Sequence, residues 1–272
     1  MDIIKAKLKD IDYLLALANS EGWNPGLNDA IPFYTADPEG FFIGMHNGEP
    51  MGCISAVAYD PHYGFMGFYI IEPSFRGKGY GMQLWDHALK YLGNRSVGLD
   101  GVVAQQENYK KSGFTLHYNN VRYQGNGTTA SSHGCSTVSF DQILEYDTAI
   151  YGLDRKKFLD PWVRMPNSLT LGNQENGRLK GFGVIRKCNI GYKIGPLFAD
   201  RLDIARELYQ ALQQFAGESP LYLDLPVVNE KAQALIQEFQ LKPVFQTARM
   251  YKGVPPKQDL DKVYGVTTFE LG

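Results

Sequence analysis

A glycine-rich hexapeptide, Arg76-Gly77-Lys78-Gly79-Tyr80-Gly81, most constrains what this chain can fold into. It follows an apolar, aromatic-rich run, Phe65 to Ile71, that predicts a buried strand, and it precedes apolar residues at helical spacing from Met82 to Leu92. A strand, a glycine turn and a helix start aim backbone N–H groups and the positive helix end at one point, which is typical of an anion-binding site. A tight turn with flexible glycines is the simpler alternative.

The spacing of these glycines decides between phosphate ligands. A dinucleotide fingerprint needs G-x-G-x-x-G, but its last glycine would fall at Met82 or Leu84, and no segment fits a Walker A loop. The remaining pattern, Arg-x-x-Gly-x-Gly, resembles the pyrophosphate loop of the GNAT N-acetyltransferase superfamily, which cradles coenzyme A. The resemblance implies that acetyl-CoA is the cosubstrate and that its pyrophosphate is held by Arg76, Gly79 and Gly81 and by the backbone of Gly77, Lys78 and Tyr80.

A second segment strengthens this resemblance, because Tyr109 to Phe114 matches the family's Tyr-x-x-x-Gly-Phe. Gly113 is the expected left-handed end of a helix, and Phe114 begins a strand. In the family the tyrosine hydroxyl lies near the coenzyme A sulfur, which implies that Tyr109 protonates the leaving thiolate. A free phenol, with a pKa near ~10, is protonated at neutral pH. An ordinary half-buried tyrosine is the alternative, and Val102 stands where the family often has a pantetheine-binding asparagine.

The resemblance also implies roles at two strand ends. Ile70 and Ile71 carry over as the strand residues whose backbone pairs with pantetheine and polarises the thioester carbonyl, although their side chains also suit a plain core. Glu72 and Asp100 end two strands that splay apart beside the acceptor in GNAT folds, so each is a candidate general base. Glu72 is equally a solvated loop carboxylate, and Asp100-Gly101 is good turn chemistry. A chain of waters would need no side-chain base.

The segment Glu21 to Asp29 falls where GNAT enzymes place the loop that covers the acceptor. Trp23, Asn24 and Asp29 are therefore expected to bind the acceptor, and a surface loop anchored by one tryptophan is the alternative. The acceptor is expected to be a small-molecule or peptide amine: amino acid, polyamine, aminoglycoside and protein lysine all stay open. A non-catalytic acyl-CoA sensor is the rival function, since it would keep the glycine loop without needing the phenol.

The apolar patterning of the first half predicts the order β-α-α-β-β-β-α-β-α-β, which the GNAT resemblance also implies. Asn47-Gly48 is a good hairpin turn between two of the strands. The expected strands are 3–7, 41–46, 51–59, 64–71, 97–102 and 114–123, and the expected helices are 8–20, 79–93 and 105–112, with short helices within 23–39.

The same order returns in the second half after a polar stretch. Two helical stretches near 139–162 precede strands at 168–171, 179–187 and 192–198, a helix at 201–216, a strand at 221–225, a helix at 228–239 and a strand at 242–251. The expected fold class is therefore α/β (α+β), as tandem GNAT folds that each have a mixed, mainly antiparallel central sheet flanked by helices. The expected boundaries are a catalytic domain at 1–124, a linker at 125–136, a degenerate domain at 137–253 and a packed tail at 254–272.

A weak internal repeat relates the two halves. The expected pairs are Phe114 with Leu241, Arg122 with Arg249, Tyr109 with Ile236, Leu99-Asp100 with Leu223-Asp224, and, with Pro73 placed on Pro196, Gly79 and Gly81 with Leu202 and Ile204. The second copy thus has the pattern of the fold without the loop or the phenol. The whole chain also resembles bacterial two-domain GNAT proteins with an Ala-Gln-Gln-x-Asn-Tyr segment and a Gly-Val-Thr-Thr-Phe-Glu-Leu-Gly-like ending.

Composition excludes several other classes. A formal net charge of -2 with dispersed lysines and arginines favours neither nucleic acid nor acidic membrane. No apolar run approaches ~20 residues, and the N-terminus lacks a signal-peptide core. Cys53, Cys135 and Cys188 are far apart and odd in number, and the five histidines have no metal spacing, so neither disulfide nor metal is expected. We expect a reduced, cytoplasmic monomer or homodimer.

Overall fold

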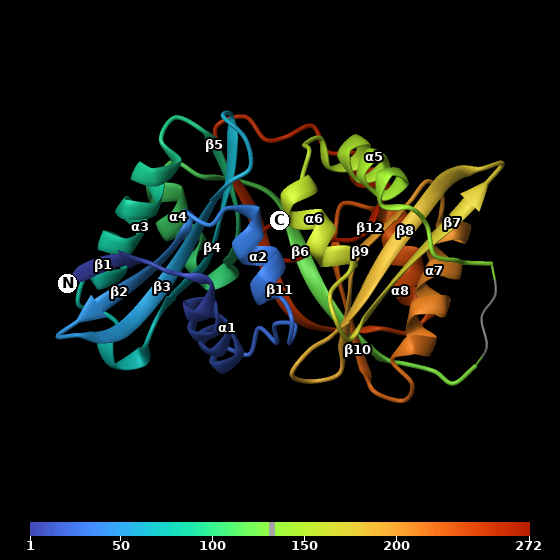
Figure 1. Cartoon of the computed structure of the whole chain (residues 1–272), viewed down its shortest axis with the longest axis horizontal. Helices are drawn as coiled ribbons and strands as arrows, with labels where there is room; N and C mark the ends of the chain where they lie inside the picture. The colour runs from blue at the N-terminus through green and yellow to red at the C-terminus, as the bar shows by residue number, and fades with distance from the viewer. Residues whose placement is uncertain (131–133) are drawn as a thin grey trace.

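The computed structural model describes residues 1–130 and 134–272. Its first half follows the predicted order of strands and helices (Figure 1). These elements are β1 (Asp2–Lys5), α1 (Ile11–Ser20), α2 (Ala30–Ala36), β2 (Phe41–His46), β3 (Glu49–Ala58), β4 (Tyr63–Ile71), α3 (Tyr80–Leu92), β5 (Ser96–Val102), α4 (Gln106–Lys111) and β6 (Thr115–Asn126).

The second half repeats that order from the helices onward, as predicted. Its elements are α5 (Phe140–Tyr151), α6 (Lys156–Val163), β7 (Ser168–Glu175), β8 (Arg178–Lys187), β9 (Tyr192–Ala199), α7 (Leu202–Phe215), β10 (Pro220–Pro226), α8 (Glu230–Glu238), β11 (Lys242–Lys252) and, in the tail, β12 (Val263–Gly265). Local chemistry explains the helix starts, because Ser139 caps α5 through the N–H of Gln142, and Asn229 caps α8 through two N–H groups.

The strands of both halves form one sheet, in the order β1-β2-β3-β4-β5-β11-β6-β10-β9-β8-β7, with β12 beside β9. Among the described residues only β4–β5 and β9–β10 pair in parallel, so the sheet is mixed and mainly antiparallel. Each half inserts its last strand into the other, since β11 lies between β5 and β6, and β6 lies between β11 and β10 (Figure 1). Of the expected linker, residues 125–126 lie in β6 and 131–133 lie outside the described residues.

Two buried ion pairs join the exchanged strands. Arg249 on β11 donates to Asp100 on β5 at 2.9 and 2.5 Å. Arg122 on β6 donates to Asp224 on β10 at 2.7 and 2.8 Å. The repeat placed Arg122 on Arg249 and Asp100 on Asp224, so one ion pair occurs twice, each time across the boundary between the halves.

Hydrogen bonds test the rest of the repeat. The N–H of Phe114 donates to the carbonyl of Tyr109, and that of Leu241 donates to the carbonyl of Ile236, so this register is confirmed. The register of Pro73 on Pro196 is wrong, because Pro196 lies inside β9 whereas Pro73 follows β4. The strand pairs instead make Met66–Leu99 equivalent to Ile194–Leu223. The second half still lacks a glycine loop, since α7 begins at Leu202, directly after Asp200 and Arg201.

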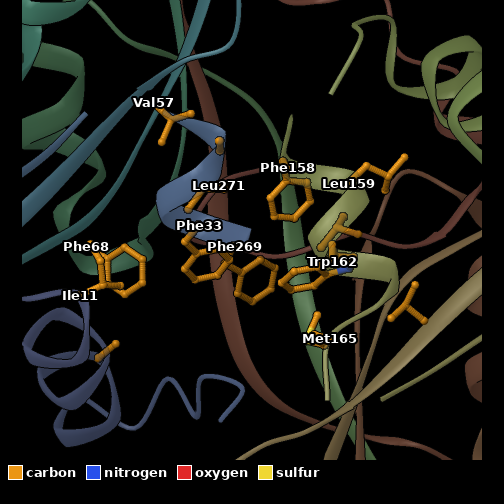
Figure 2. Packing of buried hydrophobic residues seen from close by; sticks show 14 of the residues in the cluster. Ile11, Phe33, Val57, Phe68, Phe158, Leu159, Trp162, Met165, Phe269 and Leu271 are labelled. Atoms are coloured by element: carbon orange, nitrogen blue, oxygen red, sulfur yellow. The ribbon is translucent and has the colours of Figure 1, made fainter. Parts of the chain in front are cut away.

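Apolar side chains pack on both faces of the sheet. On β3, Cys53 and Val57 face the core with α1 and α2, and Ile54 and Ala56 face the core with α3. Figure 2 shows the first of these cores extending across the boundary: Phe33 of α2 lies near Trp162 of α6, with a ring separation of 5.9 Å. The two halves therefore share a core as well as a sheet.

The tail, 254–272, packs against both halves. Val266, Phe269 and Leu271 are buried, as the apolar content of the tail predicts. In the second half β12 pairs with the end of β9, and the N–H of Val266 donates to the carbonyl of Asp224 on β10. The tail therefore fills the space where β9 and β10 move apart.

Candidate functional site

The site begins where two parallel strands separate. Pairing between β4 and β5 runs from Tyr63–Ser96 to Met66–Leu99. Beyond it β4 has a bulge, in which Phe68 adopts a φ of 49° and the register against β3 shifts. The ends of β4 and β5 are thereby left apart, with α3 and α4 following them.

The glycine loop joins β4 to the N-terminus of α3. Gly77 and Gly79 have φ values of 74° and 81°, a conformation that L side chains rarely adopt, and Gly79 immediately precedes the helix. A Cβ added at either position would meet nothing within 4 Å, so the space beside the loop is open. Gly81 differs, because its Cβ would lie 2.5 Å from the Tyr69 hydroxyl. The first turn of α3 thus presents N–H groups without intrahelical partners to an open space.

The cationic side chains of the loop are held by nearby groups. Arg76 donates from Nε to the carbonyl of Ile71 at 2.7 Å and also bonds Glu21. Lys78 donates to the carbonyl of Ser74 at 2.9 Å. Both side chains stay partly or wholly exposed beside the loop, where their charges favour an anion.

A groove of about 740 Å³ follows the loop. Its lining joins residues that are far apart in the sequence: Glu21, Trp23, Tyr69, Ile70, Ile71, Phe75, Arg76, Gly77, Gly79, Gly81, Met82, Trp85, Val102, Gln105, Asn108, Tyr109, Lys111 and Ser112. The glycine loop, the end of β4 and α4 therefore face one common space.

Tyr109 lies in the wall of this groove. Its ring stacks on Trp85 at 5.5 Å, and it packs against Gly101, where a Cβ would come within 2.2 Å of the ring. Burial, with a smaller contribution from Tyr69, raises the pKa of the Tyr109 phenol to about 12. The phenol is therefore a protonated donor at neutral pH, held rigidly by its neighbours.

A second, smaller cavity of about 50 Å³ lies beside the groove and shares Trp23, Tyr69, Trp85, Val102 and Tyr109 with it. Its other walls come from β4, β5, β11 and the tail: Met66, Gly67, Phe68, Leu99, Asp100, Gly101, Phe245, Thr247, Phe269 and Glu270. Both halves of the chain thus build this cavity, which opens between the separated ends of β4 and β5.

The two carboxylates considered as bases lie in different surroundings. Glu72 accepts from the Tyr13 hydroxyl at 2.9 Å and is absent from the walls of both cavities. Asp100 lines the small cavity, but Arg249 and Asn120 donate to its oxygens. Burial raises the pKa of Asp100 against the opposing charge of Arg249. Asp100-Gly101 lies in β5 rather than in a turn, because both residues pair with β11.

The three residues expected to bind the acceptor substrate also lie in different surroundings. Trp23 lines both cavities, whereas Asn24 exchanges two 2.9 Å hydrogen bonds with Ile190 of the second half. Asp29 is fully buried and accepts from Arg186 on β8 at 3.0 Å. Asn24 and Asp29 therefore hold the first half against the second.

Sequence reasoning missed the walls from the second half, namely Phe245, Thr247, Phe269 and Glu270. The available signal for these walls was the ending Gly-Val-Thr-Thr-Phe-Glu-Leu-Gly, which resembles the ending of bacterial two-domain GNAT proteins. No pattern in the sequence places this ending beside β4, because the contact joins two segments far apart in the chain.

Other kinds of site find no support in the described parts of the chain. No group of three or more His, Cys, Asp or Glu side chains there is arranged to hold a metal ion, and His133 falls outside them. None of the described helices is both long and apolar enough to cross a membrane.

Comparisons with known proteins agree with this geometry. Residues 8–114 match the Acetyltransferase (GNAT) family, and residues 143–265 match an Acetyltransferase (GNAT) domain. A holothin acyltransferase from Pseudoalteromonas sp. (strain SANK 73390) is 32% identical, over 98% of this chain and 93% of the relative. A crystal structure of a candidate acetyltransferase from Pyrococcus horikoshii has a TM-score of 0.86 and 22% identity, covering 100% of this chain and 95% of its own. A tandem GNAT protein from the clavulanic acid biosynthesis pathway has a TM-score of 0.64 at 12% identity, covering 92% and 97%.

Fold, groove and relatives define an acyltransferase that uses acyl-CoA. The chain belongs to the GNAT acetyltransferase family and carries two GNAT domains in tandem.

Proposed function

We propose that this chain transfers an acetyl group from acetyl-CoA to the amine of a small acceptor, with the acyl-CoA bound by its first half. The observation that carries the proposal is the continuity of two spaces. The groove beside the glycine loop shares Tyr69, Trp85 and Tyr109 with the small cavity. An acyl donor and an acceptor entering from these two sides would meet beside Tyr109.

The groove suits the donor. The open space next to Gly77 and Gly79, the free N–H groups of α3 and the charge of Arg76 and Lys78 all favour a pyrophosphate. Ile70 and Ile71 at the end of β4 would offer backbone groups to the pantetheine arm. Acetyl-CoA, once bound, would supply a thioester with an activated acyl carbon and a thiolate leaving group.

Tyr109 is the proposed general acid. Its protonated phenol would donate to the sulfur as the C–S bond breaks and as the amine nitrogen bonds to the acyl carbon. Positioning the two reactants contributes effective molarities of ~10⁵ M or more, and one acid–base group adds roughly 10²- to 10⁴-fold. The chain therefore needs no covalent acyl-enzyme.

The small cavity points to a compact acceptor. Its walls are mainly apolar and aromatic, with Trp23 from the first half and Phe245 and Phe269 from the second. The similar protein from Pseudoalteromonas is a holothin acyltransferase, which supports a small-molecule acceptor here also. Of the three acceptor residues expected from the sequence, we propose a binding role for Trp23 alone.

The test follows release of free thiol from acetyl-CoA across a library of primary amines, with protein lysine peptides and aminoglycosides included. We expect turnover with compact apolar amines and little with the bulky ones. Binding of acetyl-CoA without thiol release for any amine would overturn the proposal and favour the acyl-CoA sensor.

A further inference from the structure

Besides Asp100, a second carboxylate, that of Glu270, lines the small cavity. Glu270, the third-last residue of the sequence, is 3% exposed and lines that cavity although it belongs to the tail. Its place is fixed by the backbone, since a Cβ at Gly67 would lie 2.0 Å from the Glu270 carbonyl oxygen. The tail therefore contacts the bulged part of β4 directly, beside Phe269 at the shared core (Figure 2).

The Glu270 side chain keeps one oxygen without a partner. Its Oε2 accepts from the Thr268 hydroxyl, whereas Oε1 is buried and has no hydrogen-bond partner among the described residues. A buried polar atom without a partner is destabilising, and such atoms in folded proteins call for a specific explanation. A ligand that donates a hydrogen bond would provide one.

Glu270 makes no direct ion pair with a described residue, although Arg122, Arg186 and Lys193 lie within electrostatic range of it. Arg122 is paired with Asp224, and Arg186 is paired with Asp29 through Nε, while its two terminal nitrogens are buried without a hydrogen-bond partner among the described residues. Lys193, the other buried cation of this region, donates to the Trp23 carbonyl at 3.4 Å rather than to Glu270. These three cations act on Glu270 without a direct hydrogen bond to it, so its Oε1 stays able to accept one from a ligand.

Glu270 also fits a base better than the carboxylates expected from the sequence. Asp100 has both oxygens occupied by Arg249, with Asn120 as a further donor. Glu72 is bonded to Tyr13 and does not line the cavity. Glu270 alone among these three combines a place in the cavity wall with an unpartnered oxygen.

We infer that Glu270 binds the ammonium group of the acceptor through Oε1 and takes its proton, so that the C-terminal tail supplies the general base to the first half. This inference rests on the proposed acyltransfer. It also narrows the acceptor class to a primary amine with a compact apolar body, since cavity walls such as Phe245 and Phe269 surround the carboxylate with apolar surface.

The proton steps balance. One proton passes from the ammonium to Glu270 Oε1, and the free amine nitrogen then forms a bond to the acyl carbon while the C–S bond breaks. The sulfur takes a proton from the Tyr109 phenol. The second amine proton is lost to solvent as the amide forms, and it offsets the proton that Tyr109 must regain. Glu270 releases its own proton to solvent as the product leaves.

The experiment compares wild type with Glu270→Gln, which keeps the size and the hydrogen bonds but not the charge. The acceptor is the library amine with the highest kcat/KM. The comparison ligand is the same molecule with a hydroxyl in place of the amine. Binding of both is measured through the fluorescence of the cavity tryptophans, without acyl-CoA. Because charge-assisted hydrogen bonds are the stronger ones, we expect wild type to prefer the amine by about tenfold or more.

Glu270→Gln should abolish this preference and lower kcat by roughly 100-fold, as expected of one lost acid–base group. The matched control is Asp261→Asn, the same chemical change at an exposed position of the tail, which should leave both measurements unchanged. Thermal unfolding and acetyl-CoA binding establish that Glu270→Gln is folded. A small carboxylate such as formate should restore part of the kcat of Glu270→Ala.

Failure of this inference and failure of the proposed function give different results. If Glu270→Gln binds acetyl-CoA, keeps the preference for the amine and keeps kcat within about threefold, the inference is wrong and the acyltransferase stands. If wild type binds acetyl-CoA and acylates none of the amines, the proposed function fails and this inference fails with it.

Discussion

The two halves of this chain have the same order of elements but use the gap between their parallel strands differently. In the first half the ends of β4 and β5 enclose a cavity. In the second half the corresponding ends of β9 and β10 enclose β12 of the tail. We therefore propose that the second half does not bind a pantetheine arm, because its own chain occupies the corresponding gap.

The segment that joins the parallel strand to the next helix also differs between the two halves. Residues 72–79 join β4 to α3 and include the glycine loop, whereas residues 200–201 join β9 to α7. The elements that the halves share are those that hold the sheet together, such as the ion pairs Arg249–Asp100 and Arg122–Asp224. Packing is thus retained in both halves, whereas the glycine loop and the open gap belong, among the described residues, to the first half.

The largest effect is expected from breaking one of these reciprocal ion pairs. Arg249→Met leaves Asp100 buried without its partner, and we expect a loss of about 3–5 kcal/mol in the free energy of unfolding. Denaturant unfolding followed by circular dichroism measures it. Arg201→Met, at an exposed ion pair with Glu175, is the control and should change stability far less. Equal losses in the two variants would show that the buried pair does not stabilise the sheet.

The phenol distinguishes the halves chemically, since Tyr109 corresponds to Ile236. Tyr109→Phe should lower kcat by roughly 10- to 1000-fold, the effect of one acid–base group, while KM for acetyl-CoA moves little. Single-turnover kinetics with acetyl-CoA and the best amine would measure the chemical step. An unchanged chemical rate would remove Tyr109 from the proposed mechanism.

The loop allows a matched pair of substitutions. Gly79→Asp adds charge and backbone strain beside the groove, and Gly217→Asp adds both at a φ of 57° in the second half, where a side chain also meets open space. Because a helix N-terminus favours the phosphate anion and the new carboxylate would repel it, we expect at least ~10-fold weaker binding of acetyl-CoA for Gly79→Asp only. Calorimetry measures both variants. Equal weakening by Gly217→Asp would mean that the loop is not the specific determinant.

The smallest effect concerns pH. Burial raises the pKa of Tyr109 to about 12, so its phenol stays protonated while an unfolded tyrosine ionises near ~10. The difference in tyrosinate absorbance between wild type and Tyr109→Phe should therefore appear only toward pH 12. The stability that this protonation contributes is complete below pH ~10 and is lost as pH rises through 12. A difference signal already complete near pH 10 would contradict the burial seen here.

Sequence patterns predicted the features that depend on neighbouring residues. Apolar periodicity gave the element order, and Gly113 ends α4 with a φ of 89°, as its place before Phe114 predicts. The glycine loop, Tyr109 and Trp23 were singled out from the sequence, and all three line one groove. Each of these features was recognised from residues that lie close together in the sequence.

The features that were missed depend on segments far apart in the sequence. Exchange of β6 and β11 brings Phe245 and Thr247 to the small cavity, and the tail brings Glu270. Asn24 and Asp29 were expected at the acceptor but bond Ile190 and Arg186 instead. No pattern in a single segment reveals which strand of another half will lie beside it.

The measurement that tests the central claim most directly is the number of coenzyme A sites per chain. Calorimetric titration of the intact protein with acetyl-CoA is the right experiment, because cutting the chain between the halves would remove β11 from its place beside β5. The open gap in one half and the filled gap in the other predict one site per chain. Two sites of similar affinity would contradict the account, since the second half would then bind coenzyme A despite β12.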